Sequence, residues 1–138
     1  RAFVERLHNR IDHGDNLIVE STLSGKSLLR QIERAKTLGF ETIVMMVFLD
    51  SASTCVARVR HRVSRGGHHV PGEDIRRRYR RSLQNFWERY RFVADQWVLH
   101  HNSGEDSLAV ACGRADNYVT FNEDAMEQFL AEVEGQSK

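Results

Sequence analysis

The stretch "TIVMMVFL", Thr42 to Leu49, is a continuous apolar run in which polar and apolar residues do not alternate. Such a run is typical of a β-strand that is covered on both faces by helices. Helical patterns of ten or more residues lie on either side of it along the chain. Strands that alternate with helices of this length predict an α/β fold with an open, mainly parallel sheet and helices on both faces.

Two helices and one strand are predicted before this run. Ala2–His13 carries apolar residues at four-residue spacing, which indicates a helix. Asn16–Glu20 is a short apolar run that predicts a strand. Ser24 is a good N-cap for a second helix, which Gly39 ends.

Six further helices and strands are predicted after the run. Ala52–Ser64 repeats a helical spacing, and the stretch "RGGHHVPG" after it is a loop by its glycines and its proline. A long helix is expected from about Glu73 to Phe92, with one apolar face made of Ile75, Tyr79, Leu83, Phe86 and Tyr90. The stretch "QWVLHHNSG" predicts a strand. Two short strands, "SLAVACG" and "NYVTFN", and a helix over Asp124–Glu134 complete the pattern.

Length and composition bound the class of protein. The chain has 138 residues, of which 41% are hydrophobic and 28% charged, so residues 1–138 are expected to form one ordinary globular domain. No apolar run approaches the roughly 20 residues that span a bilayer, and no signal peptide is visible, so a cytoplasmic protein without a membrane partner is expected. Cys55 and Cys112 match no metal-ligand spacing, which favours buried thiols. The chain opens on Arg1 inside a predicted helix, which indicates a piece of a longer protein.

Basic residues are concentrated in one region of the chain. The net charge is only +1, yet Arg58–Arg91 holds eleven Arg against Glu73, Asp74 and Glu88. Such a cluster implies an anionic partner or substrate. One interpretation is therefore a binding module that docks on RNA or on an acidic protein, with phosphate contacts that depend steeply on salt.

The stretch "ESTLSGKSLL", Glu20 to Leu29, resembles a phosphate-binding loop because it contains Gly25-Lys26-Ser27. The full motif, G-x-x-x-x-G-K-[ST], requires a glycine five positions before Gly25. Glu20 occupies that position, where a carboxylate would repel phosphate and a Cβ would obstruct the turn. The stretch is therefore not a phosphate loop.

Polar side chains follow the first predicted strand. Glu20 and Thr22 would project from the carboxyl edge of the sheet, where open α/β sheets bind ligands, and they suit hydrogen bonds to the hydroxyls of a sugar or nucleoside. Alternatively, Thr22 and Ser24 cap the next helix and Glu20 is a surface charge. Asn102, at the end of the strand that begins near Gln96, either lines a nucleotide pocket or ends the sheet.

The arginines form the second candidate site. Arg62 precedes the glycine-rich loop, and a second group follows it on the long helix: Arg76, Arg77, Arg78, Arg80 and Arg81. Guanidinium groups on two facing helix ends suit phosphate binding and stabilisation of a transferred phosphoryl group. Helical spacing places Arg77 and Arg81 on one face, so the whole set cannot point at one ligand. His68 and His69 lack the acidic or Cys partners of a zinc site, so no metal site is expected there.

Four stretches in this order resemble the zeta toxin-like P-loop kinases, a family that includes UDP-N-acetylglucosamine kinases. They are "LIVESTLSGKSLLRQIERAKTLGF", "VFLD", "RVRHRVSRGGHHVPGEDIRRRYRRSL" and "ADQWVLHHNSG". The resemblance runs from about Leu17 to Gly104, and its most specific parts are G-G-H-x-V-P and R-R-Y-x-R-S. It implies a nucleotide and shikimate kinase type of fold that phosphorylates a UDP-sugar-like acceptor with ATP and Mg²⁺.

The resemblance also implies roles for residues. Glu20 and Thr22 match the Glu-x-Thr that contacts the acceptor, with His68 and Arg81 as further acceptor-binding candidates. Arg62 matches an arginine that steadies the transferred phosphoryl group, and either Arg77 or Arg78 is its partner. Asn102 is the candidate for nucleotide binding. An antitoxin is a partner implied by family analogy alone.

Two parts of the implied machinery are missing from the printed chain. The family carries its phosphate loop on the first strand and an Asp base soon after it, and both would lie upstream of Arg1. These 138 residues alone are therefore expected to bind ATP poorly and to transfer no phosphate, because the phosphate cradle and the metal supply most of the catalysis in this class.

Overall fold

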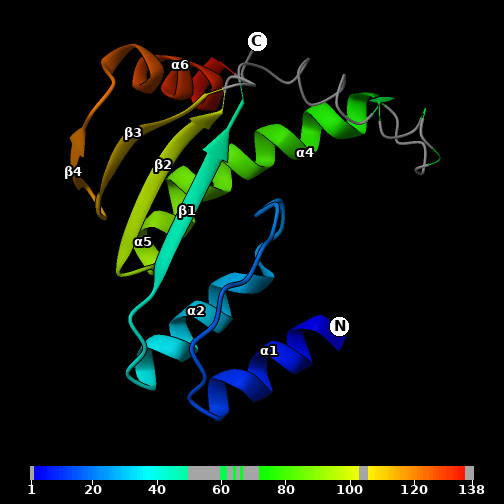
Figure 1. Cartoon of the computed structure of the whole chain (residues 1–138), viewed down its shortest axis with the longest axis vertical. Coiled ribbons are helices and arrows are strands. Elements are labelled where there is room, and N and C mark those ends of the chain that lie inside the picture. Colours follow the sequence, from blue (N-terminus) through cyan, green and yellow to red (C-terminus); the bar gives the residue numbers. More distant parts are fainter. Residues whose placement is uncertain are drawn as a thin grey trace.

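The structure of the chain is a computed structural model that describes residues 2–49, 60–61, 64, 66, 72–102 and 106–135. The named elements, in chain order, are α1 (Ala2–Asp12), α2 (Ser27–Thr37), β1 (Ile43–Phe48), α4 (Gly72–Asn85), the π-helical stretch η1 (Phe86–Tyr90), α5 (Arg91–Val93), β2 (Gln96–Asn102), β3 (Ser107–Arg114), β4 (Asn117–Thr120) and α6 (Glu123–Glu134). Figure 1 shows the strands side by side, with α1 and α2 beyond the free edge of β1. The predicted helix Ala52–Ser64 and the glycine-rich loop fall largely outside the described residues.

The sheet is mixed, with the strand order β1-β2-β3-β4. β1 and β2 are parallel, whereas β2–β3 and β3–β4 are antiparallel. The α/β class is thus confirmed, but the prediction of a mainly parallel sheet is wrong for the described strands. The reason lies in the connections, since a parallel crossover needs a dozen or more residues and only Ala115 and Asp116 separate β3 from β4.

A helical layer covers one face of the sheet. The predicted long helix is confirmed as the continuous path α4-η1-α5, and its apolar face is buried as expected. Phe86 of this path packs edge-to-face on Trp97 of β2 and on Phe129 of α6, with ring centroids 5.8 Å and 6.1 Å apart. The main core therefore lies between β2, this helical path and α6.

The opposite face of β1 is not covered by any described helix. Ile43, Met45 and Val47 alternate along the strand with exposed fractions of 58%, 57% and 46%, while Met46 and Phe48 on the other face are buried. The prediction of helices on both faces is therefore wrong for the described part of the chain.

The first two helices pack on each other around a small second core, and α2 also contacts the main core. Leu7 and Ile11 of α1 pack on Ala35 of α2, and Arg34 of α2 pairs with Asp12 of α1. Between the two helices, residues 16–20 belong to no helix or strand, so the prediction of a strand over Asn16–Glu20 is wrong in this structure. An isolated apolar run has strand propensity but needs a paired neighbour to become a strand.

Candidate functional site

A cavity of about 980 Å³ lies between β1 and the segment that joins α1 to α2. One wall is formed by residues 16–23, and the facing wall by residues 40–47 and Leu49. Helix α2 contributes the floor residues Leu28, Gln31, Ile32 and Ala35, and α4 contributes Ile75, Arg78, Tyr79 and Ser82. A volume of this size accepts a ligand as large as a nucleotide, because ligand pockets usually hold about 300–1,000 Å³.

The cavity brings together three of the residues that the sequence predicts as a site. Glu20 and Thr22 line it from the segment before α2, and Arg78 lines it from α4. All three are exposed, so their polar groups are available to a ligand. The carboxylate and the hydroxyl can bond ligand hydroxyls, and the guanidinium can bind a phosphate or carboxylate.

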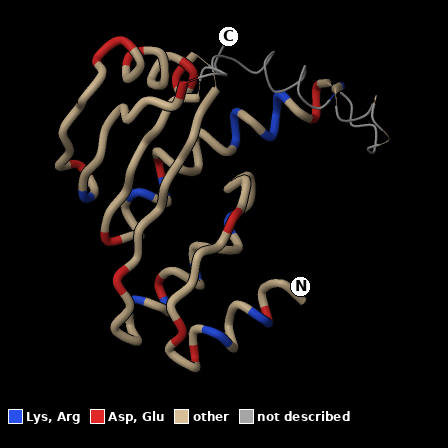
Figure 2. Tube along the Cα trace, viewed as in Figure 1, with Lys and Arg blue, Asp and Glu red and all other residues tan. Residues whose placement is uncertain are grey.

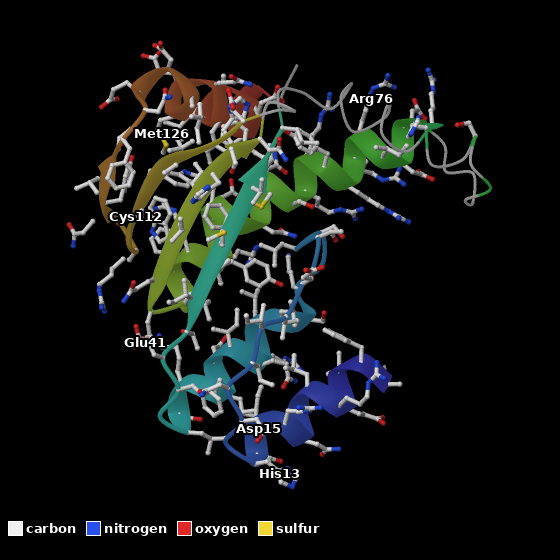
Figure 3. The ribbon with its side chains drawn as sticks, viewed as in Figure 1. His13, Asp15, Glu41, Arg76, Cys112 and Met126 are labelled. Atoms are coloured by element: carbon white, nitrogen blue, oxygen red, sulfur yellow. The ribbon has the colours of Figure 1, made fainter. Side chains whose placement is uncertain are left out.

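The other candidates do not lie in the cavity wall. Arg77 pairs with Asp74 on the surface of α4, and Arg81 is exposed but does not line the cavity. Asn102 is half-buried at the end of β2 and is also absent from the wall. Arg62 and His68 lie outside the described residues. Figure 3 shows Arg76 on the side of α4 that is turned away from α1 and α2.

The segment that carries Glu20 and Thr22 is held at its C-terminal end. Leu23 is buried and adopts a φ of 57°, and its carbonyl accepts a 2.8 Å hydrogen bond from Asn85 Nδ2. The hydroxyl of Tyr90 donates to the carbonyl of Gly25 at 2.9 Å. Burial raises the pKa of Tyr90, so the phenol stays protonated and remains a donor near neutral pH. The site thus depends on α4 and η1 for its position.

The hydroxyl groups near Glu20 organise a turn and do not cap α2. The Oγ1 of Thr22 lies 2.9 Å from the Oγ of Ser24, and the Oγ of Ser21 accepts a hydrogen bond from the backbone of Leu23. α2 begins at Ser27 with Lys26 at its N-cap, which has no side-chain cap bond. The prediction that Ser24 is the N-cap is therefore wrong, and so is the alternative that Thr22 caps this helix.

The carboxyl end of β1 is fixed to α4 beside the cavity. The hydroxyl of Tyr79 donates to the carbonyl of Leu49 at 2.9 Å and lies 3.3 Å from its N–H. Arg78 precedes Tyr79 on α4 and lines the same cavity. The helical spacing of Tyr79 favours core packing over stacking on nucleic-acid bases, and it carries no separate signal for the polar role of Tyr79 or for Ser82.

Two features of the described residues bear on a metal or phosphate site. No group of three or more His, Cys, Asp or Glu side chains among them could hold a metal ion. Gly25, Lys26 and Ser27 do not line the cavity. The carbonyl of Gly25 is instead engaged by Tyr90. The Gly25-Lys26-Ser27 stretch therefore contributes no group to the cavity wall.

Comparison with known proteins gives one partial likeness. The chain is 33% identical over 79 residues to an uncharacterized protein of Haemophilus influenzae (strain ATCC 51907 / DSM 11121 / KW20 / Rd). The match covers 57% of this chain and 56% of that protein, so it spans little more than half of the relative. No family model matches the chain, and no solved structure matches it. Among the described residues, no helix is both long and apolar enough to cross a membrane.

Proposed function

We propose that the chain carries the acceptor-binding portion of an ATP-dependent small-molecule kinase of the zeta toxin-like type, with a UDP-sugar-like acceptor. One observation supports this most strongly. Glu20 and Thr22 come from before α2 and Arg78 comes from α4, yet all three line one cavity that runs along β1 and reaches Leu49 beyond its carboxyl end. Ligands of open α/β sheets bind at this edge.

Each of these residues has a role in the proposal. Glu20 and Thr22 bond hydroxyls of the acceptor's sugar, and Arg78 bonds its diphosphate. Arg78 is also the partner proposed for Arg62, because Arg77 is engaged by Asp74. The resemblance places the phosphate loop and the Asp base upstream of Arg1, so phosphate transfer is proposed only for a chain that includes them.

The binding step can be tested on the 138 residues by titration calorimetry with UDP-N-acetylglucosamine. We expect saturable binding with one site per chain. The variants Arg78→Ala and Glu20→Gln should each weaken binding by about tenfold or more, since a hydrogen bond to a charged group contributes about 1.5–3 kcal/mol. Arg76→Ala is the matched control, because it removes the same charge from the far side of α4.

Two outcomes would count against this proposal. If the heat released on titrating the wild-type chain with UDP-N-acetylglucosamine does not saturate, the chain has no specific acceptor site. Equal loss of affinity in Arg76→Ala and Arg78→Ala would mean that general charge, and not the cavity, attracts the ligand.

A second candidate function is supported by the surface of α4. Its arginines are all exposed: Arg76, Arg77, Arg78, Arg80 and Arg81. Figure 2 shows basic residues along the middle of this helix, with acidic residues only at its start. A surface of this kind suits RNA or an acidic protein, with affinity that depends steeply on salt.

A further inference from the structure

Gln31 is a polar residue on the apolar face of α2. Leu28, one turn before it, and Ala35, one turn after it, pack in the small core that α2 shares with α1. All three residues line the cavity beside β1. The Oε1 atom of Gln31 is buried and accepts no hydrogen bond from any residue that the structure describes. A buried amide oxygen without a donor costs free energy, so its presence in a cavity wall calls for an explanation.

The hydroxyl groups on the other walls of the cavity donate elsewhere. The hydroxyl of Tyr79 donates to the carbonyl of Leu49 at 2.9 Å, and that of Ser82 donates to the carbonyl of Arg78 at 2.8 Å. The hydroxyl of Thr42 donates to the carboxylate of Asp95 at 3.0 Å. None of these three groups is therefore available to Gln31, and a molecule bound in the cavity is placed to supply the missing donor.

The surroundings of Gln31 suit a flat ring with a polar edge. Leu28 and Ile32 lie beside it on the cavity floor, and Met45 of β1, which is 57% exposed, belongs to the facing wall. Apolar walls with a small number of polar groups are typical of sites for organic ligands, in which the polar groups fix the orientation. The terminal torsion of a glutamine is soft, so its carboxamide can turn toward such a ligand at low cost.

We propose that Gln31 binds the polar edge of a uracil base. Its Oε1 accepts the N3–H of the base, and its amide N–H donates to the neighbouring carbonyl of the base, because a carboxamide offers one acceptor beside its donors. This inference rests on the proposed function, in which Glu20 and Thr22 bind the sugar and Arg78 binds the diphosphate. Gln31 thus determines which base the site accepts, namely one with a donor at position 3.

Calorimetric titration of the 138-residue chain with UDP and with 3-methyl-UDP tests the proposal, because the methyl group removes only the N3–H. We expect the wild-type chain to bind UDP at least about tenfold more tightly than 3-methyl-UDP, since a bound ligand without this donor leaves the acceptor unpaired. Gln31→Met keeps the length of the side chain but loses its hydrogen bonds. In this variant the preference should fall below about threefold, because any steric effect of the methyl group remains and the hydrogen bond does not. A preference that persists in Gln31→Met, or no preference in the wild-type chain, would overturn the role of Gln31.

Two further measurements separate this role from a structural one and from the proposed function itself. Urea unfolding of the ligand-free chain should show Gln31→Met to be at least as stable as the wild type, because it leaves no buried acceptor unpaired. A loss of stability together with unchanged binding of UDP would make Gln31 a structural residue. Saturable binding of UDP-N-acetylglucosamine without discrimination between UDP and 3-methyl-UDP overturns the role of Gln31 alone, whereas no binding of any of the three ligands overturns the proposed function with it.

Discussion

At the scale of single residues, Thr42 and Asp95 fasten the starts of the two parallel strands together. The carboxylate of Asp95 accepts hydrogen bonds from the N–H of Thr42 at 2.8 Å and from its hydroxyl at 3.0 Å. The hydroxyl of Thr42 in turn accepts from the N–H of Asp95 at 2.9 Å. Lys36 of α2 lies 3.8 Å from the same carboxylate. This clasp sets the register of β1 on β2 at one end.

Removing the clasp should destabilise the chain. We expect Asp95→Ala to cost about 1–2 kcal/mol of unfolding free energy, because two hydrogen bonds to a carboxylate are lost. Urea unfolding of Asp95→Ala, Thr42→Val and the double variant checks the pairing. The two single costs should not add in the double variant, and full additivity would mean that the residues do not act together.

The same clasp predicts how stability depends on pH. The hydrogen bond from the backbone of Thr42 is the main cause that holds the pKa of Asp95 below its ordinary value of 3.8. A carboxyl with a lowered pKa in the folded state stabilises that state above pH 3.8, and this contribution is lost as the pH falls through the folded pKa. Thermal unfolding between pH 6 and pH 3 should show a larger loss for the wild-type chain than for Asp95→Asn. If the unfolding temperatures of the wild-type chain and Asp95→Asn fall equally with pH, the Asp95 carboxylate does not stabilise the folded state.

Arg91 is a buried cation that joins the end of the long helix to the β3–β4 turn. Its guanidinium lies 3.7 Å from the ring centroid of Trp87, and it donates to the carbonyl of Ala115 at 2.9 Å. Burial lowers its pKa, and Asp116 opposes that effect. The hydrogen bond from Arg91 to the carbonyl of Ala115 is partly buried, whereas the side chain of Asp116 is 81% exposed.

Replacing Arg91 should therefore matter more than replacing its acidic partner. We expect Arg91→Met to cost about 2–3 kcal/mol, since it removes a charged donor from the partly buried carbonyls of Trp87 and Ala115. Asp116→Asn should cost less than about 1 kcal/mol, as exposed ion pairs usually do. Denaturant unfolding of both variants measures the difference, and a larger cost for Asp116→Asn would show that the ion pair is the stabilising contact.

At the scale of elements, the end of α2 sets the start of β1. Gly39 has a φ of 90°. Its N–H donates to the carbonyl of Lys36, and the N–H of Phe40 donates to the carbonyl of Ala35. These two bonds define a Schellman end, in which a side chain at the left-handed position is strained.

Gly39→Ala should thus destabilise the chain by about 1–2 kcal/mol, the cost of a left-handed conformation for a residue with a Cβ. Gly25→Ala is the matched control, because a Cβ there meets open space and no left-handed conformation is required. Thermal unfolding compares the two. A cost for Gly25→Ala as large as that for Gly39→Ala would mean that lost chain flexibility, and not strain at the end of α2, governs both.

Some elements could be predicted from the sequence and others could not. The long helix could, because Ile75, Tyr79 and Leu83 repeat at helical spacing and all face the core. The helix–strand alternation at the start of the chain favours parallel strands, whereas the short connections between β2, β3 and β4 allow only antiparallel pairing. Residues 16–20 have the composition of a strand, but pairing depends on a neighbour that local sequence does not specify.

At the scale of the whole molecule, only some of the predicted site residues lie together in the cavity beside β1. Glu20 and Thr22 could be placed because they follow an apolar run, and Arg78 because it belongs to a dense basic helix. Which arginine enters the cavity depends on the phase of α4 against β1. The repeat of Ile75, Tyr79 and Leu83 predicts which face of α4 is buried, but no sequence pattern reveals the hydrogen bond from Tyr79 to Leu49 that joins α4 to the end of β1.

The central claim is that the cavity beside β1 binds a nucleotide sugar, and NMR shift mapping tests it most directly. Unlabelled UDP-N-acetylglucosamine is added to the ¹⁵N-labelled chain at low and at high salt. The account predicts saturable shifts at residues 20–22, at the end of β1 and at Arg78, with little dependence on salt. Shifts spread over the exposed arginines of α4 that vanish at high salt, with the cavity residues unmoved, would contradict it and favour an anion-binding surface.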